Sequence, residues 1–153
     1  MLAPADRIPA YRLSMGTTLP GVGPLVRHWS RTLGADLRER SAAGAGRGSA
    51  AGQDVIIDCR SAAYLAAWKP PAGTAWLTVR VVAEQHGVRT VVSHHAKHTR
   101  GVLTHHLLTR PGRPPRTVAA TVAAARELVG TVLQEVSHVP AEKGPDTLEL
   151  VLA

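Results

Sequence analysis

Hydrophobic positions repeat with a helical period in several parts of the chain. Apolar side chains recur every fourth residue along 24–40 and predict an amphipathic helix there, with the stripe Leu25, Trp29, Leu33 and Leu37. The same period predicts helices at 93–110 and 117–129, which are ended by proline and glycine respectively. A shorter helix is predicted at 62–68, where Ser61 is the expected N-cap residue.

Runs of β-branched and aliphatic residues between these helices predict the strands of a sheet. The predicted strands are 54–58, 76–83, 88–94, 131–139 and 147–152. His86 and Gly87 separate two of them and predict a tight hairpin turn. The combined pattern is typical of an α+β fold, a mixed sheet with packed helices, and it contains no internal repeat.

The remaining segments have the composition of loops. Residues 1–23 are rich in proline and glycine and lack a helical period, so we expect an extended, irregular start. Residues 41–53 consist mainly of Gly, Ala and Ser and predict a flexible surface loop. With 153 residues and 44% apolar content, the chain is expected to form a single domain, 1–153, around an aliphatic core.

Charge is concentrated around one predicted helix. The formal net charge is +7, and no Asp or Glu lies between Gln85 and Arg126. This basic window contains seven cations: Arg89, Lys97, Arg100, Arg110, Arg113, Arg116 and Arg126. Because the rest of the chain has eleven basic and eleven acidic residues, the window carries the whole excess and predicts an anionic partner.

The basic helix has a predictable division of faces. At about 100° per residue, the face toward the core consists of Ala96, Thr99, Leu103 and Leu107. A neighbouring flank consists of Lys97, Gly101, Thr104 and Leu108, and Arg100 lies between this flank and the core. Two cations beside a glycine near a helix start favour a phosphate site, with a solvated basic face that binds nothing as an equal alternative.

Histidines on the same helix suggest a metal site only at first sight. His94, His98 and His105 share one face, but the first and last lie roughly 16 Å apart along the helix axis. No acidic residue is close in sequence to complete a ligand set. We therefore expect exposed, neutral histidines and no metal site.

Two further groups have weaker claims to chemistry. Cys59 follows a strand next to Arg60, but no motif supplies a base, so a buried structural cysteine is favoured over a nucleophile. Asp54 and Asp58 lie on one side of a strand, where an acid/base pair is conceivable but separate solvation is favoured. The glycines of 44–52 match no phosphate-binding loop, and the sequence implies no cofactor.

The cysteine count and the hydropathy indicate the cellular compartment. A single cysteine excludes an internal disulfide framework and favours a reducing compartment. No apolar run approaches the ~20 residues that a membrane span needs. The N-terminus lacks the pattern of a secretion signal. We expect a cytoplasmic protein that does not cross a membrane.

Four segments carry a resemblance to a known family. They are P-A-D-R-I-P-A-Y-R-L-S-M-G (4–16), D-V-I-I-D-C-R-S-A-A-Y (54–64), W-K-P (68–70) and V-V-S-H-H-A-K-H-T-R-G (91–101). In this order and spacing they resemble the peroxide stress resistance protein YaaA family. The resemblance extends from Pro4 to the end of the chain. Family members are longer by roughly a hundred N-terminal residues, so we expect this chain to be an N-terminally truncated form.

The resemblance implies a cytoplasmic bacterial protein of the hydrogen-peroxide response. Such a protein would limit damage linked to unincorporated iron and would bind duplex or distorted DNA through a basic cleft. Carried over residue by residue, the cleft would be lined by Arg12, Lys69, Lys97 and Arg100. Ser61 and Tyr64 also match the family pattern, without an assigned role. Neither enzymatic activity nor an obligate protein partner is implied.

Two alternatives stay open at this point. One is a protein that handles iron, or an uncharacterised enzyme, that uses Cys59 or the histidines. The other is a fragment without function, because the first part of the family's length is absent. His94 and His95 also replace positions where the family commonly has an aromatic residue and another polar or aromatic one, which changes the local packing.

Overall fold

A computed structural model describes residues 14–45, 54–92 and 95–153. Its helices are α1 (Leu25–Ala45), α2 (Ala62–Leu65), α3 (Ala96–Thr109) and α4 (Val118–Arg126). Its strands are β1 (Thr18–Leu19), β2 (Gly23–Pro24), β3 (Ile56–Asp58), β4 (Trp76–Gln85), β5 (Val88–Val91), β6 (Leu133–Val139) and β7 (Asp146–Leu152). No helix in these ranges is long and apolar enough to span a membrane.

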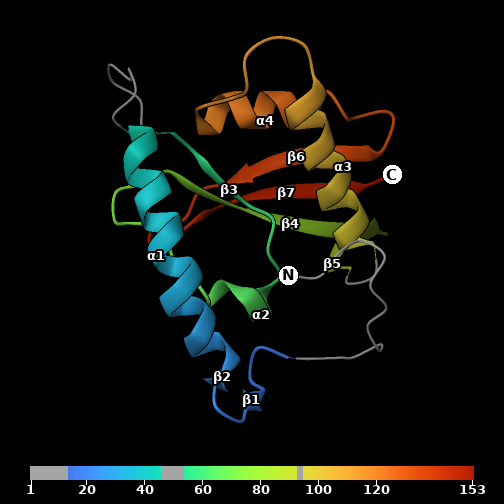
Figure 1. Ribbon diagram of the computed structural model, residues 1–153. Coiled ribbons are helices and arrows are strands. Elements are labelled where there is room, and N and C mark those ends of the chain that lie inside the picture. The colour runs from blue at the N-terminus through green and yellow to red at the C-terminus, as the bar shows by residue number, and fades with distance from the viewer. Residues whose placement is uncertain (1–13, 46–53, 93–94) are drawn as a thin grey trace, which may run out of the picture.

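A mixed five-stranded sheet forms the centre of the molecule (Figure 1). Its order is β3-β4-β7-β6, and β5 pairs with β4. The central strand β4 is parallel to β3 and β7, whereas β6 is antiparallel to β7. The short strands β1 and β2 form a separate two-stranded sheet just before α1. The predicted α+β class with a mixed sheet is confirmed.

One face of this sheet carries the core. Alternate residues of β4 and β7 are buried there, namely Leu77, Val79, Val81, Leu148 and Leu150. They pack against α3 and α4, which lie across the same face (Figure 1). The α3 residues predicted to face the core, Ala96, Thr99, Leu103 and Leu107, are all buried. Each fully buried Leu or Val contributes about 1.5–3 kcal/mol.

Turn and cap residues define the ends of several elements. His86 and Gly87 have φ angles of 51° and 77°, and they join β4 to β5 in the predicted tight hairpin. The Thr117 side chain accepts a hydrogen bond of 3.1 Å from the backbone N–H of Ala120 and caps α4. The helix predicted at 117–129 ends at Arg126, so Gly130 does not cap it; it lies in the turn beyond, with a φ of 84° that glycine adopts without strain.

Helix α1 is longer than predicted. It continues to Ala45, so the first five residues of the predicted loop 41–53 are helical. The alanines in this stretch have the highest helix propensity and outweigh the cost of one glycine. Residues 46–53 lie outside the described residues, and the rest of the loop prediction stays a prediction.

The apolar stripe of α1 is only partly buried. Trp29 and Leu33 are 45% and 39% exposed, respectively. The helix approaches its neighbours at Gly34, where a Cβ would lie 3.6 Å from Cδ1 of Trp68. Gly34 is buried, so the contact side of α1 differs from the stripe that the four-residue spacing predicts.

Several predicted boundaries move. The predicted helix 62–68 ends at Leu65, and the strand predicted at 76–83 continues to Gln85. The strand predicted at 88–94 ends at Val91, and the basic helix begins at Ala96. The irregular start predicted for 1–23 lies outside the described residues up to residue 13; beyond it the chain forms β1, β2 and the turns around them.

Candidate anion-binding site

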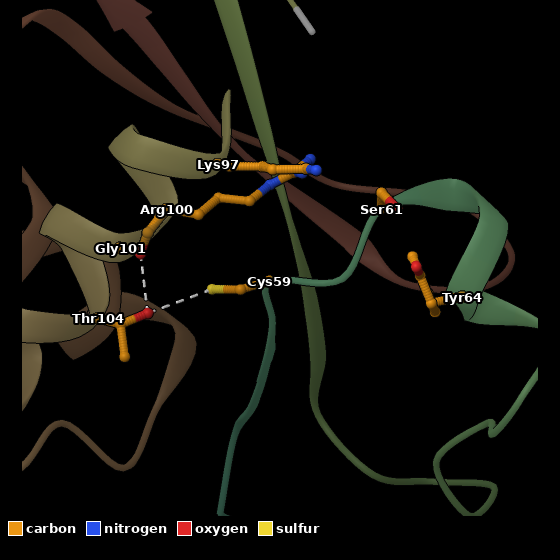
Figure 2. A pocket seen from close by; sticks show the side chains of 7 residues that line it. All are labelled: Cys59, Ser61, Tyr64, Lys97, Arg100, Gly101 and Thr104. Carbon is orange, nitrogen blue, oxygen red and sulfur yellow. Dashed lines mark hydrogen bonds between the residues drawn. The ribbon is translucent and has the colours of Figure 1, made fainter. Parts of the chain in front are cut away.

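A pocket of about 340 Å³ lies between α3 and the connection from β3 to α2. One wall is Lys97, Arg100, Gly101 and Thr104, all from α3, and the other is Cys59, Ser61 and Tyr64. Figure 2 shows the side chains of Lys97 and Arg100 extending from α3 toward Ser61. Because these seven residues include no Asp or Glu, the lining has a formal charge of +2.

Arg100 is oriented by a neutral acceptor. Its Nε and Nη2 donate hydrogen bonds of 3.2 and 2.9 Å to the backbone oxygen of Val79 in β4. A guanidinium has five N–H donors, so three are left for another partner. A carbonyl oxygen fixes the orientation of the side chain but does not cancel its charge. Arg100 is half-buried, and the carbonyl oxygen of Val79 holds its side chain in place.

Lys97 and Arg100 differ from several other cations of the basic window. Neither has a carboxylate partner within the described residues. Three of the others form salt bridges with acids from outside the window, in the pairs Arg89 with Glu84, Glu135 and Glu149, Arg110 with Glu127, and Arg116 with Asp54. Folding thus balances part of the charge asymmetry of the sequence, and among the described residues it leaves the two pocket cations, together with Arg113 and Arg126, without a salt bridge.

An ion pair fixes the opposite wall. Asp58 is 5% exposed, and its carboxylate accepts hydrogen bonds from Nη2 of Arg60 at 2.6 Å and from Nε1 of Trp76 at 3.2 Å. Burial opposes ionisation of Asp58, but these hydrogen bonds outweigh it, so its pKa lies below the ordinary value. Arg60 also donates to the carbonyl oxygens of Tyr64 and Trp68 and lies 5.5 Å from the centroid of the Trp68 ring. One guanidinium therefore holds α2 against the end of β3.

Neutral groups complete the pocket. The hydroxyl of Thr104 donates to the carbonyl oxygen of Arg100 at 2.8 Å, and its oxygen lies 3.7 Å from Sγ of Cys59. Either atom of this pair can be the donor. Burial raises the pKa of the Cys59 thiol despite the opposing effects of Thr104 and Arg100. Cys59 is therefore a protonated, weakly polar part of the lining at neutral pH.

Ser61 has the position that the sequence predicts but not the expected bond. It is the N-cap residue of α2 with extended backbone angles, yet its side chain makes no capping hydrogen bond. Its hydroxyl lies in the lining of the pocket beside Tyr64. The hydroxyl is thus available to a ligand.

The predicted binding residues are only partly brought together. Lys97 and Arg100 lie in the pocket, as the helix geometry predicts. Lys69 is exposed and does not line it, and Arg12 lies outside the described residues, so the roles of both stay predictions. Ser61 and Tyr64 had only a family pattern in their favour, and the structure adds them to the pocket.

Histidines contact single carboxylates in two places, His106 with Glu127 and His138 with Asp146. His98 and His105 are exposed, and His94 lies outside the described residues. In the ranges that the structure describes, no three His, Cys, Asp or Glu side chains lie close enough together to hold a metal ion.

The two aspartates of the β3 segment have separate partners. Asp54 forms a 2.6 Å salt bridge with Arg116, which lowers the pKa of Asp54, and Asp58 pairs with Arg60. Each carboxylate is thus engaged by its own guanidinium and not by the other carboxylate.

Sequence reasoning did not connect Cys59 with the basic helix, because 45 residues separate it from Thr104.

Comparison with known proteins places the chain in a family. The model for the peroxide stress protein YaaA matches residues 1–123. A UPF0246 protein of Streptomyces coelicolor is 42% identical over 123 residues, which cover 80% of this chain and 43% of that protein. A UPF0246 protein of Corynebacterium efficiens is 38% identical over 69% of this chain and 39% of its own length. A UPF0246 protein of Delftia acidovorans is 30% identical over 92% of this chain and 51% of its own length. The chain spans about half the length of these relatives or less, and it belongs to the family of the peroxide stress protein YaaA.

Proposed function

We propose that this protein acts in the cytoplasmic response to peroxide, where it limits iron-linked damage and binds DNA by contacting backbone phosphates with Lys97 and Arg100. The observation that carries the DNA contact is the pair itself: two cations in one pocket, without a carboxylate partner in the described part of the chain. Membership of the YaaA family supports the peroxide-stress context.

The two cations complement each other chemically. Arg100 presents a planar fork whose orientation is fixed by Val79, and such a fork suits two oxygens of one phosphate. Lys97 is a mobile point charge one helical turn away. Contacts of this kind supply affinity that depends on salt and not on base sequence.

An enzymatic role for Cys59 has less support. A cysteine nucleophile acts as a thiolate, and burial raises the pKa of this thiol. Its sulfur contacts a threonine hydroxyl, which is not a base at neutral pH. The pocket therefore favours binding over nucleophilic chemistry.

The test is the affinity for a fluorescent DNA duplex, measured by anisotropy. We expect the double variant Lys97→Ala/Arg100→Ala to bind about a hundredfold more weakly, since a hydrogen bond to a charged group contributes about 1.5–3 kcal/mol. Arg113→Ala is the matched control, because Arg113 is exposed and does not line the pocket. If the double variant and the control lose the same binding free energy for each charge removed, binding follows net charge alone and the site is refuted.

A further inference from the structure

The pocket offers more donors than a backbone phosphodiester can use. Lys97 has three N–H donors, Arg100 has three that Val79 does not occupy, and Ser61 and Tyr64 add two hydroxyl groups. A phosphodiester has one negative charge and two non-bridging oxygens. A phosphate monoester has three terminal oxygens and a charge of about −1.5 to −2 at pH 7. The lining charge of +2 and the surplus of donors both match the monoester.

The shape of the pocket points the same way. A Cβ built at Gly101 would meet no atom within 4 Å, so the α3 wall is open at that residue. Behind it, the neutral pair of Cys59 and Thr104 adds no negative charge. A phosphate inside a duplex has a sugar on both sides, whereas a terminal phosphate has a sugar on one side only. A terminal phosphate can therefore enter a recess that the continuous backbone can only cover.

An aromatic side chain in the pocket lining could stack on a nucleobase. Tyr64 is 48% exposed although it lines the pocket, and it lies on the wall opposite Lys97 and Arg100 (Figure 2). An exposed aromatic ring beside a cationic phosphate site is the usual arrangement for stacking a base. The α2 turn that carries Tyr64 is held by Arg60 through the carbonyl oxygen of Tyr64 itself.

We propose that the pocket binds the phosphate monoester of a nucleotide, with the phosphate between Lys97 and Arg100 and the base against Tyr64. On DNA this group is a terminal phosphate at a strand end, and the choice of that source rests on the proposed function. A free nucleoside monophosphate presents the same chemistry without DNA.

Two sets of probes distinguish these sources. The first compares a 5′-phosphorylated oligonucleotide with a 5′-hydroxyl oligonucleotide that is one nucleotide longer, so that both strands have the same number of phosphates and the added phosphate of the second is a diester. The second measures binding of adenosine monophosphate, inorganic phosphate and adenosine by calorimetry. We expect the 5′-phosphorylated strand to bind about tenfold more tightly, as one additional charge-assisted hydrogen bond predicts. Adenosine monophosphate should bind, and adenosine should not.

Variants distinguish binding in the open space at Gly101 from binding by net charge alone. Gly101→Leu fills the open space without changing charge, and the preference for the 5′-phosphate should disappear. The control is Ala123→Leu, the same type of change at an exposed position of α4. Tyr64→Ala should weaken the binding of adenosine monophosphate by about tenfold and leave the binding of inorganic phosphate unaffected, because stacking involves only the base.

The outcomes separate the two proposals. Equal affinity for both strands, together with no binding of adenosine monophosphate, overturns the monoester site while leaving salt-dependent DNA binding intact. Binding of adenosine monophosphate without DNA binding supports the monoester site with a free nucleotide as the source and refutes the DNA proposal. Binding of none of these probes refutes both.

Discussion

Replacing Arg60 with alanine should destabilise the protein by about 3 kcal/mol. The substitution leaves the carboxylate of Asp58, whose side chain is 3% exposed, without its guanidinium partner. Breaking a buried ion pair costs about 3–5 kcal/mol, and the lower end applies because a quarter of the Arg60 side chain is in contact with water. For a chain of this length the melting temperature should fall by about 6–12 °C.

The cost should depend on pH in a defined direction. The pKa of Asp58 is lowered in the folded protein, so its stabilising contribution is present above the unfolded pKa of about 3.9 and is lost as the pH falls through the folded pKa. Without Arg60, burial is opposed less strongly and the pKa of Asp58 rises. The difference in unfolding free energy between wild type and variant should therefore be largest at about pH 6–7, where Asp58 is ionised, and should shrink below about pH 4.

Urea denaturation followed by tryptophan fluorescence measures this difference, since Trp68 and Trp76 both contact the pair. Arg40→Ala is the matched control, because it breaks an exposed i,i+4 pair with Asp36 and should cost less than about 0.5 kcal/mol. Equal losses in the two variants, or a cost for Arg60→Ala that does not change with pH, would refute the assigned role of the buried pair.

Three further predictions concern the pocket and the core. Gly101→Ala should raise the unfolding free energy by about 1 kcal/mol, because glycine is unfavourable inside an exposed helix and the added methyl meets nothing; an unchanged melting temperature would contradict this. Leu103→Ala should cost about 2–5 kcal/mol in the same assay, whereas Leu108→Ala, at an exposed site of the same helix, should cost under about 0.5 kcal/mol; equal costs would contradict the assigned helix faces. Alkylation of Cys59 by iodoacetamide should have its pH midpoint above about 8.5, since burial raises the pKa of the thiol, and a midpoint near 7 would restore the nucleophile hypothesis.

The basic helix is where sequence reasoning succeeded most fully. Its period placed Leu103 in the core and Lys97 and Arg100 on an accessible side, and the structure confirms each position. This works because a helix has a fixed rotation per residue, so local spacing determines which side chains share a face. The hairpin at His86 and Gly87 was predictable for the same local reason.

Contacts between distant segments were not predictable in this way. Nothing in the sequence near Arg89 or Arg116 reveals that both form salt bridges with distant acids. The meeting of Cys59 with Thr104 depends on the tertiary fold, which brings the end of β3 beside α3. At α1, Gly34 is buried beside Trp68 whereas Trp29 and Leu33 are exposed, a division that the spacing of the larger side chains did not predict.

The salt dependence of DNA binding tests the central claim most directly. The claim is that Lys97 and Arg100 contact phosphates, and each such contact contributes about 0.9 to the slope of log affinity against log salt concentration. The double variant Lys97→Ala/Arg100→Ala should therefore bind with a slope shallower than that of the wild type by about 1.8. A double variant with the slope of the wild type would contradict the account, whatever its affinity at a single salt concentration.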